Sequence, residues 1–384
     1  MKKATMKSWS AVHKWSSLVC TVFILMLCIT GLPLIFSHEI DHALGYAVEA
    51  PSIEHDGERA SPDRIISDAA ERQPGNAVQF LVGDPDEPNL WFVRLGEEVN
   101  AADPSGFFTY DARSGEFLSE YPVETGITSI LLSLHIDMFA GLPGMLFLGF
   151  MGFLLLVSLV SGAYLYGPFM RNLRFGEVRR ERPGRIKWLD LHNALGIVTL
   201  VWFFVVTATG VINTLVFPIF EQWQTTELAE LTEPYRDLPP VKDPVSVDRV
   251  LASAREVAPD MALSFMAFPG NDFATPHHFI AYMQGTTPLT SSLLEFVLIE
   301  ADTGKAVTRS ELPWYVETLL VSQPLHFGDY GGMPLKLVWA LLDILTIVVL
   351  GSGLYLWLKR GRAGAQTEPA RTDAALPQTR GYNA

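Results

Sequence analysis

Four apolar stretches restrict this chain more than any other feature of its sequence. They cover Trp15–Phe36, Leu142–Tyr166, Ala194–Phe220 and Leu337–Trp357, and only the last contains a charged residue, Asp343. An α-helix needs about 20 apolar residues to cross the hydrocarbon core of a bilayer. The sequence therefore predicts four transmembrane helices in a lipid membrane. We expect the first to be retained, because its apolar run exceeds a signal-peptide core and no small-residue cleavage site follows it.

Lysine and arginine near the helix ends predict the orientation. They precede the first stretch, crowd the short connection between the second and third, and follow the fourth. The positive-inside rule places these segments, and with them both termini, in the cytoplasm. The long connections 37–134 and 221–325 are acidic and account for the net charge of −14, so we expect them in the periplasm, outside an inner membrane. The sequence offers no basic patch for a nucleic acid.

The sequence also repeats itself. Leu134-His135 and Leu325-His326 are each followed by a proline eight residues after the histidine. Each then runs into an apolar stretch that ends in Ser-Gly-x-Tyr-Leu-[Tyr/Trp], and the offset between the copies is 191 residues throughout. This regularity predicts an internal duplication.

A second repeated pair supports the duplication. His13 stands 18 residues before Gly31, and His192 stands 18 residues before Gly210; both glycines follow a threonine. Eighteen residues make about five helical turns, so each histidine shares a helix face with its glycine roughly 27 Å away. Each histidine is thus expected at the cytoplasmic end of its helix, and each glycine at the outer end.

The two acidic connections are predicted to form small α+β modules. Ser61 is expected to cap a helix with Asp63 in its first turn, and Ser246 begins a similar helix 185 residues later. Each module closes on a tight turn that ends at a glycine, Gly115 or Gly304, where a positive φ is available. Strands are expected at Val78–Val82, Leu90–Leu95, Phe279–Met283 and Phe296–Ile299.

The Asp-x-x-[Ser/Thr]-Gly turn, the Leu-His motifs and the Ser-Gly-x-Tyr-Leu helix ends together resemble the PepSY-associated transmembrane (PepSY-TM) proteins, from about residue 8 to 362. Within that family, the chain resembles ferric-siderophore reductases of the FoxB type. The resemblance implies a dihaem b-type enzyme, a haem-dependent ferric-chelate reductase that passes electrons outward to a ferric siderophore and releases Fe(II). It also implies a membrane α-helical fold with four transmembrane helices, an internal duplication and two α+β PepSY-like periplasmic modules.

The expected organisation follows from the repeat and the resemblance. It comprises the cytoplasmic N-terminus with the first helix (1–38), a first periplasmic module (39–134), the second helix (135–167), a basic cytoplasmic loop (168–188), the third helix (189–220), a second periplasmic module (221–325), the fourth helix (326–358) and a cytoplasmic tail (359–384).

Four histidines are the expected axial ligands of two haem b groups. A haem that only transfers electrons takes two strong axial ligands, often imidazoles. His13 and His192 are expected at the cytoplasmic face, and His135 and His326 at the periplasmic face. Helices at opposite faces cannot share one haem, so we pair His13 with His192 and His135 with His326. A lone histidine at a membrane surface is usually just a polar tip, but duplicated positions favour ligation.

Five further residues have weaker assignments. Gly31 and Gly210 are expected beside the outer haem, where a missing side chain lets the macrocycle approach. His38 and His42, one turn apart at the outer end of the first span, either replace an outer ligand or touch substrate. Asp343 lies within the membrane, where a carboxylate indicates function by default: it relays protons, or it is hydrogen-bonded between helices.

Several observations limit the mechanism. The two cysteines lie within the first span, which excludes Fe–S clusters and c-type haem attachment. No flavin or nicotinamide motif is present, so the electron donor is expected to be a separate cytoplasmic reductase, free reduced flavin or membrane quinol. His277 and His278 are candidates for chelate contact or plain loop residues. Two alternatives stay open: an electron-transfer subunit for another periplasmic acceptor or quinone, and a non-enzymatic PepSY-type binding protein.

Overall fold

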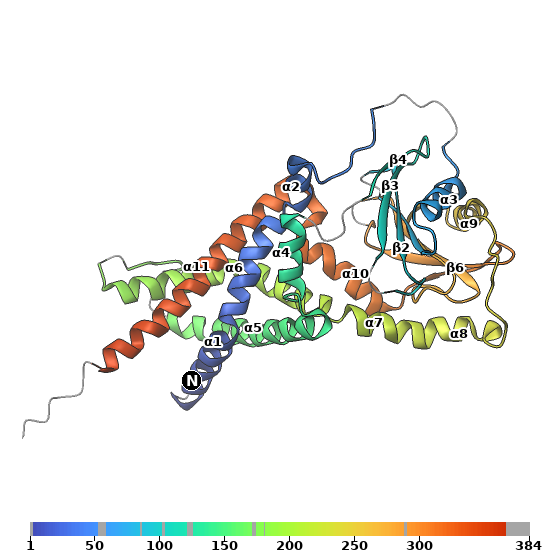
Figure 1. The fold of residues 1–384 in the computed structure, drawn as a ribbon. Coiled ribbons are helices and arrows are strands. Elements are labelled where there is room, and N and C mark those ends of the chain that lie inside the picture. The colour runs from blue at the N-terminus through green and yellow to red at the C-terminus, as the bar shows by residue number, and fades with distance from the viewer. Residues whose placement is uncertain are drawn as a thin grey trace, which may run out of the picture.

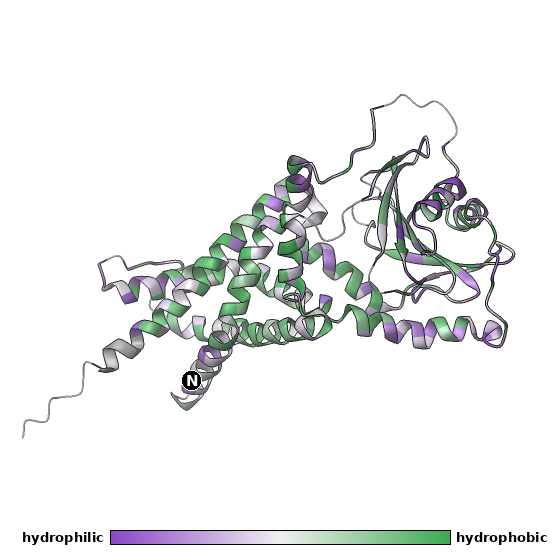
Figure 2. Ribbon diagram, viewed as in Figure 1, coloured by the Kyte–Doolittle hydropathy of each residue, from purple (hydrophilic) through white to green (hydrophobic). Residues whose placement is uncertain are grey.

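The computed structural model places the four apolar stretches in four long helices (Figure 1). They are α1 (Lys3–Leu34), α5 (Gly141–Met170), α6 (Gly184–Asn213) and α11 (Gly332–Ala365). Each is long and apolar enough to cross a membrane, and only 22–44% of each apolar window is buried inside the protein. The rest is apolar surface for lipid, as the hydrophobic colouring of the bundle shows (Figure 2). The chain is therefore a membrane protein.

The structure describes residues 3–52, 59–84, 87–101, 104–120, 126–170, 174–179, 181–287 and 290–365. Arg171 and Arg180 of the expected basic loop, and the expected cytoplasmic tail beyond residue 365, lie outside this range.

The four long helices pack as a ring in which α1 contacts α5 and α11, and α6 contacts the same two helices. Glycines bring two of them close: a Cβ on Gly149 of α5 would lie 2.3 Å from the Thr214 hydroxyl oxygen just after α6. The third helix is shorter than expected. It ends at Asn213, and α7 (Val216–Trp223) follows as a separate helix. Pro218 has no N–H with which to continue the hydrogen-bond ladder across this break.

Short helices precede or follow the membrane helices on the side of the sheet. They are α2 (Ser37–Leu44), α4 (Ile127–Ile136) and α10 (Trp314–Phe327). The Leu-His motifs lie in the last turns of α4 and α10, not at the starts of the membrane helices as the sequence suggested. Positive φ angles at Met138 (56°) and Phe139 (59°) end the helical conformation between α4 and α5. Gly328 (83°) does the same after α10.

Both acidic connections contribute to one antiparallel sheet of eight strands in the order β4-β3-β2-β1-β5-β6-β7-β8. The two expected modules are therefore joined, through Phe80, Leu81 and Val82 of β1 opposite Ala267, Met266 and Phe265 of β5. This pairing covers one exposed edge of each four-stranded half. All four expected strands are confirmed. The strands are β1 (Ala77–Gly83), β2 (Leu90–Gly96), β3 (Gly106–Asp111), β4 (Phe117–Glu120), β5 (Met261–Ala267), β6 (His278–Gly285), β7 (Leu294–Glu300) and β8 (Ala306–Glu311).

Helices cover both faces of the sheet. On the far side from the membrane bundle lie α3 (Pro62–Arg72) and α9 (Val247–Val257), whose apolar faces are buried against the strands (Figure 1). On the near side, Trp223 of α7 and Val316 of α10 pack against the opposite face. The sheet is thus attached to the bundle through α7 and α10. The remaining short elements are the π-helical turn Gln224–Leu228, α8 (Ala229–Leu231) and 3-10 turns at Glu233–Tyr235 and Asp329–Gly331.

The helices α3 and α9 cap each other. Ser61 stands at the expected N-cap of α3, but its side chain bonds to Asp248 and does not cap its own helix. Instead, Asp63 accepts a 2.6 Å bond from the backbone N–H of Val247, and Asp248 accepts from the N–H of Asp63 at 3.4 Å. A carboxylate from each helix therefore satisfies the N-terminal donors of the other.

Candidate functional site

The structure brings the four histidines together in the two pairs that topology predicts. The ring centres of His13 on α1 and His192 on α6 are 6.4 Å apart, with an interplanar angle of 67°. The ring centres of His135 on α4 and His326 on α10 are 6.2 Å apart, also at 67°. The pairs lie at opposite ends of the bundle, because His135 meets α1 at Gly31, which is about 27 Å along the helix from His13.

His13 and His192, at the end of the bundle away from the sheet, are called the inner pair, and His135 and His326, on the side of the sheet, the outer pair. Each inner imidazole is held by a neighbouring membrane helix. His13 Nδ1 lies 2.9 Å from the carbonyl oxygen of Ser158 on α5. His192 Nδ1 lies 3.0 Å from the carbonyl oxygen of Val349 on α11, and 3.0 Å from the hydroxyl of Ser352. A carbonyl can only accept, so both Nδ1 atoms carry the hydrogen.

The outer imidazoles are held in the same way. His326 Nδ1 donates to the carbonyl oxygen of Val206 on α6 at 2.8 Å, and lies 3.4 Å from the hydroxyl of Thr209. His135 Nδ1 lies 2.9 Å from the hydroxyl oxygen of Thr30 on α1, and the backbone of Leu27 also bonds to this ring. Thr30 donates its own hydrogen to the carbonyl of Met26, so its oxygen accepts from the imidazole.

All four histidines therefore occupy one recurring cradle, in which a backbone carbonyl is followed three residues later by serine or threonine and four residues later by glycine. The glycine leaves room for the ring. A Cβ would lie 3.0 Å from the nearest imidazole atom at Gly31 and Gly162, 2.9 Å at Gly210 and 3.4 Å at Gly353. Gly31 and Gly210 thus lie against the outer imidazoles themselves.

Two of these glycines escaped the sequence reasoning. Gly162 and Gly353 belong to the Ser-Gly-x-Tyr-Leu motif, which the sequence presents only as a helix end. The signal was present, because a hydroxyl residue followed by glycine recurs once for each histidine.

The geometry fits a metal ion between the rings of each pair. With Nδ1 donating to the cradle, each Nε2 keeps a free lone pair. An imidazole nitrogen binds a first-row ion at about 2.0–2.1 Å, so two imidazoles on opposite sides of one ion have ring centres roughly 6.3 Å apart. The observed separations of 6.4 and 6.2 Å agree with this value. The donor set also suits the haem iron that the family resemblance implies.

The weaker candidates lie elsewhere. His38 and His42 on α2 belong to neither pair and face each other. Asp343 is buried between α11 and α1, beside Cys28, and its Oδ2 atom has no hydrogen-bond partner among the described residues. His277 and His278 are buried and not surface loop residues: β6 begins at His278, whose side chain is fully enclosed, so neither is placed to meet a chelate.

The buried His278 has a strongly shifted pKa. Burial lowers its pKa from 6.5 to about 4, and the neighbouring His277 acts in the same direction. Its Nδ1 is hydrogen-bonded to the hydroxyl of Thr275 at 2.7 Å. The residue is therefore neutral near pH 7 and serves the packing of the sheet.

A cavity of about 570 Å³ lies in the sheet domain, between α9 and the ends of β1, β2 and β5. Its lining includes Arg59, Trp91 and Arg255. Because α9 covers the sheet on the side away from the membrane bundle, the cavity is separated from the outer histidine pair by the sheet (Figure 1).

Comparison with known proteins identifies a family. The sequence profile described as the PepSY-associated TM region matches residues 10–360, nearly the whole chain. The chain is also similar to the "Uncharacterized protein PA4219" of Pseudomonas aeruginosa, with 26% identity over 268 residues, which cover 65% of this chain and 67% of that protein. The profile shows the membrane-protein family, and neither comparison shows that the chain is a reductase of the FoxB type.

Proposed function

The chain belongs to the PepSY-associated TM region family, and on that premise we propose that it is a dihaem b protein that carries single electrons outward across a bacterial inner membrane to a ferric siderophore. The observation that carries the proposal is the two histidine pairs, one at each end of the membrane bundle, each with ring centres separated by the span of a bis-imidazole metal site. Each pair would supply two imidazole ligands to a haem iron, a donor set that suits electron transfer.

In this proposal, His13 and His192 hold the inner haem, and His135 and His326 hold the outer one. Each haem, when bound, supplies reversible one-electron chemistry. The chain fixes the ring orientation through the cradle, because an Nδ1–H bonded to a carbonyl sets the tautomer and increases the basicity of Nε2. The equivalence of the cradles supports an internal duplication, in which α1 and α5 correspond to α6 and α11.

The orientation follows from charge. The connection from α5 to α6 lies at the end of the bundle away from the sheet domain (Figure 1). In or beside it are five basic residues, Arg174, Arg179, Arg182, Arg185 and Lys187. By the positive-inside rule this end faces the cytoplasm, so we place the termini there and the sheet domain in the periplasm.

The proposed reaction balances as one electron per iron. A cytoplasmic reductase, reduced flavin or membrane quinol gives up the electron at the inner face, and the Fe(III) of the siderophore takes it up at the outer face. The products are Fe(II) and the free siderophore. A quinol would supply two such electrons and release two protons over two turnovers. Reduction weakens the binding of iron by hard oxygen ligands, which releases the metal.

The test uses the full chain in detergent, reduced anaerobically with dithionite and freed of excess reductant. Adding a ferric siderophore should reoxidise the protein and yield one Fe(II) per electron, trapped by an Fe(II)-specific dye, faster than unrelated acceptors do. Equal rates with every acceptor would favour an electron-transfer subunit for another periplasmic acceptor or quinone. Protein that lacks a Soret band would refute the proposal.

One observation favours the non-enzymatic alternative, a PepSY-type binding or regulatory protein. The 570 Å³ cavity in the sheet domain is in the range of small-ligand sites, about 300–1,000 Å³. If ligand binding there is the function, replacing His326 with alanine should leave it intact. The electron-transfer proposal expects that substitution to abolish outward reduction.

A further inference from the structure

A second group of metal-ligating side chains lies outside the histidine pairs. It contains His38, His42 and Glu87, whose ligand atoms all lie within 4.8 Å of one another. The two histidines are one turn apart on α2, and their Nε2 atoms are separated by 3.2 Å. Glu87 comes from the loop between β1 and β2 of the sheet domain. The group therefore joins the membrane part of the chain to the sheet.

A carboxylate orients one of the two histidines. Glu49 Oε1 lies 3.0 Å from His42 Nδ1, so this nitrogen carries the hydrogen and donates to the carboxylate. His42 Nε2 then carries the lone pair and accepts a hydrogen bond from His38 Nε2–H at 3.2 Å, a hydrogen that a bound metal would displace. Metal-binding histidines usually donate their second ring N–H to such an acceptor, which fixes the tautomer and orients the ring.

The helix that carries the two histidines is fixed to the membrane bundle on two sides. Lys336 at the start of α11 forms a 2.9 Å ion pair with Glu39. Thr128 on α4 donates a 2.6 Å hydrogen bond to Asp41. These contacts lie on the residues next to His38 and His42, so both imidazoles project from a braced helix.

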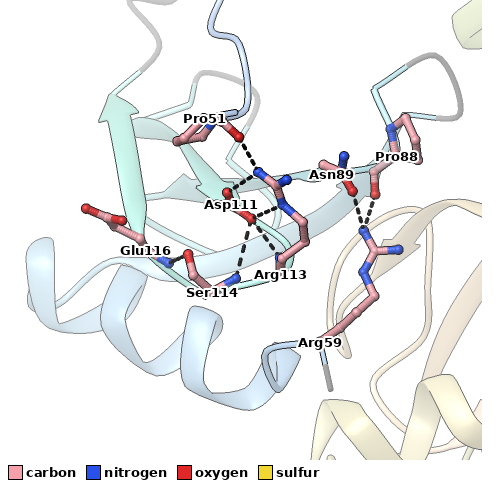
Figure 3. Close-up of polar contacts among 8 residues, drawn as sticks. All are labelled: Pro51, Arg59, Pro88, Asn89, Asp111, Arg113, Ser114 and Glu116. Carbon is pink, nitrogen blue, oxygen red and sulfur yellow. Dashed lines mark hydrogen bonds and ion pairs between the residues drawn. The ribbon is translucent and has the colours of Figure 1, made fainter. Parts of the chain in front are cut away.

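The chain segments next to the two carboxylates are anchored by arginines (Figure 3). Arg59 donates to the carbonyl of Pro88 and to the Asn89 side chain, which secures the loop that carries Glu87. Arg113 donates to the carbonyl of Pro51 at 2.6 Å, two residues beyond Glu49. Arg113 is itself fixed by a 2.7 Å ion pair with Asp111.

We propose that His38, His42 and Glu87 form a binding site for a divalent first-row transition metal, and that Fe(II) is its occupant in function. Two imidazoles and one carboxylate leave open coordination positions for water or chelator oxygens, the ligand set typical of non-haem Fe(II). The choice of iron rests on the proposed function, whereas metal binding as such does not.

The position of the site gives the iron assignment its meaning. Thr128, which bonds to the α2 residue next to His42, lies seven residues before His135 on α4, or about 10.5 Å along that helix. The helix that carries the site is therefore attached to α4 about two turns from His135, at the end of the bundle where the proposed reaction releases Fe(II). In this proposal, the site binds the Fe(II) that the siderophore releases.

The experiment uses full-length protein in detergent, stripped with EDTA and titrated by calorimetry with Zn(II) and, anaerobically, with Fe(II). We expect one equivalent of either metal, with Zn(II) the tighter as the Irving–Williams order requires. The double variant His38→Ala/His42→Ala should abolish binding and Glu87→Gln should weaken it. Glu49→Gln should cost about 10- to 100-fold in affinity, the usual effect of removing an orienting carboxylate.

Glu97→Gln is the matched control, because Glu97 is an exposed glutamate of the same sheet half. It should bind metal like the wild type. Absence of stoichiometric binding in the wild type, or unchanged binding in the double variant with an unaltered haem spectrum, would overturn the proposal. Haem content and reoxidation rate are measured on the same samples. Metal binding that depends on His38 and His42, in protein without haem, would refute the proposed function alone, and haem without metal binding would refute the site alone.

Discussion

Replacing Gly210 with alanine tests the cradle that positions the histidines. The added Cβ would lie 2.9 Å from Cε1 of His326, whereas ordinary contacts begin near 3.4 Å, so the ring must move by roughly 0.5 Å. Overpacking of this kind costs about 1–3 kcal/mol, and stretching the 2.8 Å bond to Val206 adds about 0.5–1.5 kcal/mol. Alanine returns about 1 kcal/mol of helix propensity. We expect a net loss of about 1–3 kcal/mol.

The matched variants lie on α11. Gly353→Ala places its Cβ at 3.4 Å from His192, an ordinary contact, and Gly351→Ala meets nothing within 4 Å. Both should leave stability unchanged or raise it by up to about 1 kcal/mol.

The assay is thermal unfolding of the full chain in detergent, combined with the low-spin haem spectrum. Only Gly210→Ala should shift the signal of the outer haem. If Gly210→Ala behaves like Gly351→Ala in both readouts, the cradle does not position the ligand and the reasoning is refuted.

Three further predictions follow from buried groups. Burial lowers the pKa of His278 from 6.5 to about 4, so on acidification the unfolded chain binds a proton at this side chain before the folded chain does. The free energy of unfolding of the sheet domain should therefore be at its full value above pH 6.5 and fall by up to about 3 kcal/mol as the pH drops to 4. In denaturant titrations, His278→Gln should flatten this pH dependence. Trp223→Ala removes a fully buried ring packed 5.3 Å from Phe296 and should cost about 3–5 kcal/mol, measured as a lower midpoint of sheet-domain unfolding. Asp343→Asn preserves the shape of a buried side chain whose Oδ2 has no partner in the described part of the chain, so the free energy of unfolding should stay within about 1 kcal/mol of the wild type and both haem spectra should be unchanged. Loss of either haem would show that the haem sites need the Asp343 carboxyl group.

The sequence predicts the helices and the histidine pairs for a physical reason. Apolar runs of bilayer length form helices in lipid, and the positive-inside rule then separates His13 and His192 from His135 and His326. The positions of the strands can also be predicted from the sequence, because apolar segments such as Phe279–Met283 are bounded by turn residues.

What the sequence left out depends on long-range contacts. The pairing of β1 with β5 joins segments about 185 residues apart, and no local pattern specifies it. The break after His135 rests on two non-glycine residues with positive φ, Met138 and Phe139, which propensities disfavour. The group of His38, His42 and Glu87 arises only when α2 and the sheet are brought together.

The central claim is that the two histidine pairs ligate two haems, and the haem-to-protein ratio of single-ligand variants tests it most directly. The wild type should contain two haem b groups per chain. His13→Ala and His192→Ala should each lose one haem and remove the same spectral component, while His135→Ala and His326→Ala should remove the other. A wild type without haem, or loss of one shared component in His13→Ala and His135→Ala, would contradict the account.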